Sequence, residues 1–152
     1  MKYQYGTEQP YIASYVVLRN NDGYIALVLR ENTGWRDGFY GLPSGKVERN
    51  ETFSACAIRE AKEEVDIDVK PEDLQHALTM QRLEKEETNW IDVFFVAKKW
   101  LGEPRNAEPQ KHRELLWVAP DALPENMVPN VRDALEQINK GNIFREYGWE
   151  EA

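Results

Sequence analysis

The sequence GKVERNETFSACAIREAKEEVDI, residues 45–67, decides the fold. The segment from Glu51 to Val65 predicts a helix, because apolar side chains recur on one side of it at helical spacing. Asn50 is a candidate N-cap for this helix. The apolar side consists of Ala57, Ile58, Ala61 and Val65. We therefore expect a loop that leads into an amphipathic helix packed against a core.

Three glutamates crowd the last turns of the predicted helix: Glu60, Glu63 and Glu64. At helical spacing they fall within an arc of about 100°, which is offset from the apolar side. Like charges three and four residues apart destabilise a helix, so solvent or a bound cation has to compensate for them. Taken by itself, this pattern is more typical of a solvated acidic face than of a site.

The residues that precede the glutamates give them a specific context. Read from Gly45, the spacing of glycine, glutamate, Arg-Glu and Glu-Glu resembles the Nudix box, the signature of the Nudix hydrolases. The matching glycine and polar positions are Gly45, Glu51, Arg59, Glu60, Glu63 and Glu64, with aliphatic Ala61 and Ile67 at the apolar positions. The resemblance covers nearly the whole chain, since the order of strands and helices outside the box also looks like that of the family.

Two positions depart from the family pattern. Asp66 stands where the box normally ends in glycine, and we expect it to adopt a left-handed backbone conformation, which aspartate tolerates. Many relatives have two glycines where this chain has Ser44 and Gly45, in the sequence LPSG. The side chain of Ser44 therefore leaves less room for close approach to the backbone beside the expected metal site. The first departure concerns the end of the helix, and the second lies nearer the chemistry.

The remaining pattern predicts an α+β protein with the Nudix fold, a mixed β-sheet sandwiched between α-helices, in a single domain over residues 1–152. Strands are expected at 11–19 and 24–30, joined as a hairpin by the turn NNDG. Residues 31–50 are typical of a long ordered loop without regular elements. Further strands are expected at 76–83, 89–100 and 114–118, with an acidic turn at 84–88, and a last helix at 131–140. The tail FREYGWEEA, residues 144–152, has no assignment.

The resemblance implies a reaction and a cofactor. Family members use water to cleave a pyrophosphate bond in a nucleoside diphosphate linked to another group, with the help of Mg²⁺ or Mn²⁺. Glu60, Glu63 and Glu64 would be metal ligands together with the backbone carbonyl of Gly45, and clustered carboxylates are the ligands that such hard cations require. Glu64, or a glutamate outside the box, would accept the proton.

Arg59 would hold the neighbouring carboxylates in position, and the family pairs it with Glu51 as a structural contact. Eight helical residues span about 12 Å along the axis. The pairing therefore needs Glu51 to lie at or before the first turn. The alternative for Glu51 is a charge that only complements the helix dipole.

A further acidic ligand or base often comes from a later loop in the MutT-like branch of the family. The loop GEPRNAEPQKHREL offers Glu103, Glu108 and Glu114. We choose Glu108 as a catalytic residue because it lies in the middle of the loop. The alternative is an exposed loop carboxylate, since loops are normally polar.

The MutT-like branch acts on nucleoside triphosphates, and it reads the base partly with an asparagine after a Leu-Pro or Phe-Pro step. In LPENMVPN this asparagine is Asn126, whose carboxamide can both donate to and accept from a purine. Its alternative is a turn residue. Trp35 and Phe39, with Tyr40, are candidates for base stacking, although aromatic residues on a long loop are as often its packing anchors.

Composition excludes some classes of protein. The 152 residues include 19 basic and 27 acidic side chains, a formal net charge of -8, which argues against coating of a nucleic acid duplex or a membrane surface. Cys56 is the only cysteine, and it is more typical of a buried structural thiol than of a nucleophile. No intramolecular disulfide is possible, and the N-terminus lacks the apolar run of a secretion signal, so we expect a cytoplasmic protein.

Two hypotheses from different classes follow. The first is a cation-dependent Nudix pyrophosphohydrolase that converts a nucleoside triphosphate, including oxidised ones, to monophosphate and pyrophosphate, or acts on another diphosphate such as ADP-ribose. The second is a Nudix-fold module that binds a nucleotide or sugar nucleotide without cleaving it. The complete set of box glutamates favours the enzyme. The expected partner is a small-molecule nucleotide, and a homodimer is common in the family.

Overall fold

The computed structural model describes residues 9–85 and 88–150. In chain order its elements are β1 (Tyr11–Leu18), β2 (Ile25–Arg30), β3 (Tyr40–Gly41), β4 (Ser44–Lys46), α1 (Phe53–Val65), a 3₁₀ turn η1 (Pro71–Asp73), β5 (Leu74–Leu83), β6 (Asn89–Ala97), β7 (His112–Val118), α2 (Pro129–Asn139) and β8 (Phe144–Tyr147). The later strands and the last helix are confirmed, with ends that differ from the predicted ones by up to three residues. No helix in the described part of the chain is long and apolar enough to cross a membrane.

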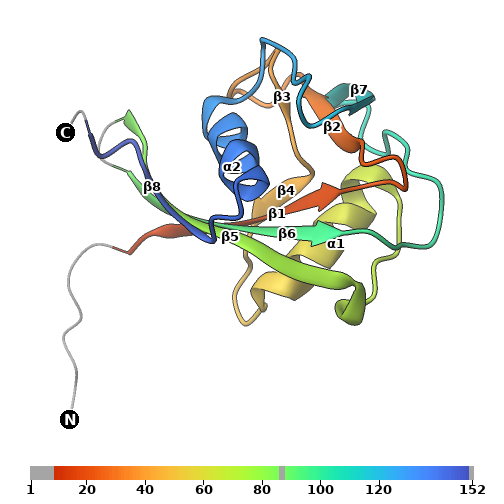
Figure 1. Ribbon diagram of the computed structural model, residues 1–152, viewed down its shortest axis with the longest axis horizontal. Coiled ribbons are helices and arrows are strands. Elements are labelled where there is room, and N and C mark those ends of the chain that lie inside the picture. The colour runs from red at the N-terminus through yellow and green to blue at the C-terminus, as the bar shows by residue number, and fades with distance from the viewer. Residues whose placement is uncertain (1–8, 86–87, 151–152) are drawn as a thin grey trace.

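A five-stranded mixed sheet is the centre of the molecule, with the strand order β4-β1-β6-β5-β8. β1 runs parallel to β6 and β5 parallel to β8, whereas the β1–β4 and β5–β6 pairs are antiparallel. Helix α2 covers one face of this sheet and α1 the other (Figure 1). Because successive side chains point to opposite faces, each face has its own apolar cluster. The α+β prediction of a mixed sheet between helices is therefore confirmed.

The predicted hairpin between the first two long strands is wrong. β1 belongs to the five-stranded sheet, while β2 lies in a separate three-stranded sheet with β3 and β7. The turn itself forms, because the side chain of Asn20 accepts hydrogen bonds from the backbone of Asp22 and Tyr24. Beyond one bridge between Arg19 and Ile25 the two strands diverge, because β1 pairs with β6 and β2 pairs with β7.

Residues 31–50 contain two short strands where the sequence predicts only loop. β3 pairs with β2, and β4 pairs antiparallel with β1, so that Gly45 lies opposite Ser14. Between β2 and β3, the carboxylate of Asp37 accepts hydrogen bonds from the backbone of Thr33 and Gly34. The short strands bring the start of the Nudix-like sequence to the edge of the main sheet.

Helix α1 begins two residues later than predicted, and its N-cap is not Asn50. Thr52 caps the helix, and its hydroxyl accepts a hydrogen bond of 3.1 Å from the backbone N–H of Ala55. Asn50 instead adopts a left-handed conformation with φ 62° in the preceding turn. At the other end, Asp66 has φ 57° and ψ 44°, as predicted, and its N–H donates to the carbonyl of Lys62.

The C-terminal tail, which the sequence left unassigned, forms the edge strand β8 beside β5 (Figure 1). Arg145 forms two hydrogen bonds with Asp133 of α2, at 2.8 and 3.0 Å. The indole N–H of Trp149 donates to the carbonyl of Gln81. The last two residues of the tail, 151 and 152, lie outside the described residues.

Candidate active site

The contact between Gly45 and Glu60 joins the edge of the sheet to helix α1. A Cβ atom at position 45 would lie 2.0 Å from Oε1 of Glu60, so any larger residue would push this carboxylate away from the strand. The thiol of the buried Cys56 donates to the carbonyl of Gly45 at 3.5 Å, so helix α1 also holds the backbone of Gly45 in place. Burial raises the pKa of this thiol to about 11, and Cys56 is therefore a packing residue.

Glu64 lies beside Glu60 and is equally buried, each residue being 9% exposed. Its Oε2 accepts a hydrogen bond of 2.9 Å from the backbone N–H of Ser44. Because this contact uses only the backbone of Ser44, the serine keeps the donor that a glycine would supply. Burial, and then the nearby charge of Glu60, raise the pKa of Glu64 well above its usual range.

Glu60 has the same kind of environment. Burial is the main reason that its pKa rises to about 7, and the charges of Glu63 and Glu108 act in the same direction. Arg59 opposes this rise through a hydrogen bond of 2.8 Å to Oε1 of Glu60. The two buried carboxylates thus have an excess of negative charge around them, which a bound cation would compensate.

Arg59 connects the start and the end of α1. Its Nε and Nη2 donate to the two carboxylate oxygens of Glu51 at 2.7 and 3.0 Å, and this contact lowers the pKa of Glu51 to about 2. Glu51 precedes the Thr52 cap, so it lies before the first turn, the position that the pairing needs. The structure forms the Arg59–Glu51 pair that the family resemblance implies.

Glu63 has a more open position than its neighbours. Its side chain is 51% exposed and lies 3.3 Å from Nη1 of Arg59. Within residues 9–85 and 88–150, no three acidic, histidine or cysteine side chains stand close enough together to enclose a metal ion. The donors that lie together are Glu60, Glu64 and the backbone at Gly45. They fit a hard divalent cation in their oxygen chemistry and their uncompensated charge.

Glu108 lies near the end of α1 because its loop is fastened to the helix. The N–H groups of Arg105 and Ala107 donate to the carbonyls of Val65 and Glu64. The charge of Glu108 raises the pKa of both Glu60 and Glu64, and its own carboxylate lies 3.6 Å from Lys111. Of the other two candidates, Glu103 is exposed and Glu114 accepts a hydrogen bond from the hydroxyl of Tyr40.

A cleft of about 980 Å³ opens beside these carboxylates, and Ser44, Gly45 and Glu64 form part of its wall. Six basic residues that were not predicted as site residues also line it: Arg30, Arg36, Lys46, Arg82, Lys85 and Lys111. This local surplus of cations gives an acidic protein a place for a polyanion. Lys46 follows Gly45 and Arg36 follows Trp35 in the sequence, and this proximity to predicted site residues was their only signal.

The predicted base-binding residues have different positions. Trp35 lines the cleft, and its ring lies 5.0 Å from the guanidinium of Arg30. Phe39 packs against the apolar cluster beneath α2, and Tyr40 packs beside it. The carboxamide of Asn126 donates to the carbonyl of Gly38 at 2.9 Å. Trp35 is therefore the member of this group that the structure brings into the cleft.

His112 also lines the cleft, although it was not among the residues predicted from the sequence. It lies opposite Arg30 in the β2–β7 pair and is buried. Burial lowers its pKa to about 4, so the imidazole is neutral at physiological pH.

A mixed sheet between two helices, with a short strand that delivers a glycine to a glutamate-bearing helix, defines the class of Nudix-fold hydrolases. Comparison with known proteins gives the same class. The family model described as NUDIX domain matches residues 10–138. The chain therefore belongs to the Nudix family, and its relatives indicate a MutT-like hydrolase of phosphoric anhydride bonds.

Several relatives illustrate the similarity. The chain is 31% identical to a MutT NUDIX hydrolase from Burkholderia pseudomallei of known crystal structure, with a TM-score of 0.77 over 86% of this chain and 98% of that one. It is 26% identical to an RNA pyrophosphohydrolase from Erythrobacter litoralis over 82% of this chain and 85% of the relative. A MutT protein from Methanosarcina mazei, 23% identical, shares the fold with a TM-score of 0.74 over 90% and 97% of the two chains.

Proposed function

We propose that the protein is a Mg²⁺- or Mn²⁺-dependent pyrophosphohydrolase that converts a nucleoside triphosphate to the monophosphate and pyrophosphate. The observation that carries this proposal is a pair of buried carboxylates at the wall of a cleft rich in basic side chains: Glu60 lies against Gly45, and Glu64 accepts a hydrogen bond from the backbone of Ser44. Buried carboxylates without matching cations are unfavourable, unless a bound cation or a proton neutralises them.

Different residues would bind the cation and position its ligands. Glu60, Glu63, Glu64 and the carbonyl of Gly45 would hold the cation. Arg59, fastened by Glu51, positions Glu60 and Glu63 through its hydrogen bonds. A bound divalent cation would neutralise phosphate charge and polarise the phosphorus.

Phosphate oxygens have basic partners along the cleft, namely Arg30, Lys46 and Lys111. Water attacks a phosphorus atom of the triphosphate, the anhydride bond to the leaving phosphate oxygen breaks, and a glutamate takes the proton of the water. Glu64 and Glu108 are the candidates for this proton acceptor. Glu64 is the more buried of the two, and Glu108 is the nearer to a lysine.

The base end of the substrate is assigned to the aromatic part of the cleft. Trp35 lines it directly, while Phe39 supports the loop from the core side. Asn126 remains a prediction as a base contact, since its carboxamide N–H donates to Gly38 in this structure. We infer a cytoplasmic location from the single reduced cysteine. Homodimer formation also remains a prediction.

A substrate screen with Mg²⁺ or Mn²⁺, read by release of phosphate, pyrophosphate and nucleoside monophosphate, tests the proposal. We expect nucleoside triphosphates to be the best substrates. Faster hydrolysis of ADP-ribose or of RNA with a 5′-triphosphate would replace this substrate with the faster one, and the name of the Erythrobacter litoralis relative makes the RNA a necessary member of the panel. Tight binding of a nucleotide without any hydrolysis would favour the binding module instead.

A further inference from the structure

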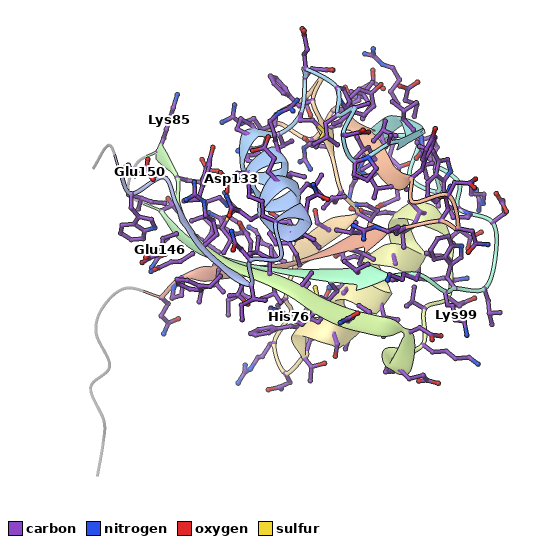
Figure 2. All side chains as sticks on the ribbon, viewed as in Figure 1. His76, Lys85, Lys99, Asp133, Glu146 and Glu150 are labelled. Carbon is purple, nitrogen blue, oxygen red and sulfur yellow. The ribbon has the colours of Figure 1, made fainter. Side chains whose placement is uncertain are left out.

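A cavity of about 580 Å³, which we call the lysine cavity, is lined by Lys70, Lys98 and Lys99 and has no lining residue in common with the cleft. Trp90 near the start of β6 lines the cleft, whereas Lys98 follows the end of β6. A rise of about 3.3 Å per residue puts the two ends of this strand about 23 Å apart. Figure 2 shows Lys85 of the cleft and Lys99 of the lysine cavity at opposite ends of the molecule.

The three lysines carry charge that is not paired within the protein. All three are exposed, and the ion pairs within residues 9–85 and 88–150 include none of them. Two carboxylates share the wall, but Asp68 already faces the ammonium of Lys62 at 3.5 Å. With Asp73 as the other carboxylate, the cavity keeps a surplus of positive charge in a protein whose formal net charge is -8. Such a local surplus attracts an anion.

Trp100 gives the lysine cavity an aromatic wall in a fixed position. Its half-buried ring stacks on that of Trp117 of β7, with the ring centroids 6.2 Å apart and the planes inclined by 21°. The next residue, Leu101, exchanges two backbone hydrogen bonds with Asp68, at 2.9 and 3.0 Å. Both the ring and the backbone beside it are therefore held in place before any ligand binds. A preorganised ring of this kind can stack on a flat ligand at little cost in entropy.

The turn after β1 adds polar donors to the opposite wall. Asn20 and Asn21 both line the lysine cavity. The side-chain oxygen of Asn20 accepts hydrogen bonds from the backbone N–H groups of Asp22 and Tyr24, at 3.0 and 2.9 Å. These contacts fix the carboxamide and leave its NH₂ group available as a donor. The cavity thus combines ammonium groups, an amide donor and an indole.

We propose that the lysine cavity is a second binding site, which takes a phosphate monoester attached to a flat ring, the chemistry of a nucleoside monophosphate. The ammonium groups and the amide of Asn20 would donate to the phosphate oxygens, and the ring would lie against Trp100. The volume falls in the range that small-molecule ligands occupy. Binding there does not depend on hydrolysis in the cleft, because the two sites have separate walls.

The indole N–H signals of the five tryptophans can report on the two sites separately, because Trp35 and Trp90 line the cleft and Trp100 lines the lysine cavity. Proton–nitrogen correlation spectra of the full chain are recorded during a titration with AMP. Trp100→Phe keeps a ring against Trp117 and identifies the Trp100 signal by its loss; should this variant fail to fold, triple-resonance assignment of the wild type identifies it. AMP should shift the Trp100 signal to saturation. Adenosine and inorganic phosphate should each bind there at least about tenfold more weakly, because each lacks one of the two recognised groups.

Replacing the exposed lysines tests the charge directly. Lys98→Gln/Lys99→Gln should raise the Kd for AMP measured at the Trp100 signal by about tenfold, and it should leave the shifts of the Trp35 and Trp90 signals unchanged. Lys140→Gln is the matched control, because Lys140 is an exposed lysine at the end of α2, and it should leave this Kd unchanged.

An AMP titration that leaves the Trp100 signal in place would overturn the proposal, and so would equal weakening in the Lys98→Gln/Lys99→Gln and Lys140→Gln variants. Equally tight binding of AMP and adenosine at Trp100 would overturn the role of the phosphate. AMP binding at Trp100 in a protein that hydrolyses no nucleotide would refute the proposed activity and leave the second site standing.

Discussion

Helix α1 and the β5–β6 pair both bury charged side chains, but they balance the charge differently. In the β5–β6 pair, Asp92 meets Arg82 through two hydrogen bonds, so the buried negative charge has its own buried cation. At α1, Arg59 is shared among Glu51, Glu60 and Glu63, and Glu64 accepts from the backbone of Ser44.

The difference indicates what each region is for. A closed ion pair is a structural arrangement, and breaking it leaves an uncompensated charge in the interior. An open group of carboxylates is unfavourable without a ligand, and it therefore binds a cation more strongly than a closed pair would. The following predictions test this comparison, beginning with the largest effect.

Neutralising the open group should abolish activity without unfolding the protein. Glu63→Gln and Glu64→Gln should each lower turnover by orders of magnitude, because an amide keeps the shape of the side chain but loses the charge that holds the cation. Steady-state kinetics at saturating Mg²⁺ measures this, with thermal melting as the control for folding. Rates near that of the wild type in either variant would remove that residue from the site.

Breaking the closed pair of Arg82 and Asp92 should instead lower the stability of the protein. Arg82→Met leaves Asp92 buried and unpaired, and we expect the free energy of unfolding to fall by about 3–5 kcal/mol. The double variant Arg82→Met/Asp92→Leu should recover much of this loss, since it removes both charges. Urea denaturation followed by fluorescence measures all three proteins. Equal stability of the wild type and Arg82→Met would show that the pair is not closed in solution.

Cation binding should stabilise the protein through the open group alone. At a Mg²⁺ or Mn²⁺ concentration of about 100 times Kd, a ligand bound only by the folded state adds about 2.7 kcal/mol, which raises Tm. The rise should disappear in Glu60→Gln/Glu63→Gln/Glu64→Gln and persist in Arg82→Met. Thermal melting with and without the cation makes the comparison. An undiminished rise in the triple variant would place the cation elsewhere.

The smallest effect concerns Asn126, which lies in neither region. If it reads a purine, Asn126→Ala should lower kcat/KM for purine nucleoside triphosphates about fivefold, which corresponds to one net hydrogen bond of about 1 kcal/mol. Pyrimidine substrates should be less affected. Kinetics on a matched purine and pyrimidine panel decides between the roles: a uniform change, or none, leaves Asn126 as the residue that fastens Gly38.

Local spacing in the sequence was sufficient to predict helix α1 and to identify the family. The period of a helix places Glu60, Glu63 and Glu64 on one side whatever the rest of the chain does. The pairing of Glu51 with Arg59 was implied by the family resemblance and not by the spacing itself. The left-handed conformation of Asp66, by contrast, depends only on the end of the helix. Such features could be predicted because each depends on backbone geometry within one or two turns.

Tertiary structure decided how the elements meet. A local turn predicted that β1 and β2 pair, but contacts with β6 and β7, more than 60 residues away, separated them. The burial of Glu60 and Glu64 and the gathering of basic residues around the cleft likewise come from several strands. Arg82 and Asp92 face each other only because β5 and β6 pair in one register. Burial and charge balance depend on which distant segments pack together, and no single stretch of the sequence contains that information.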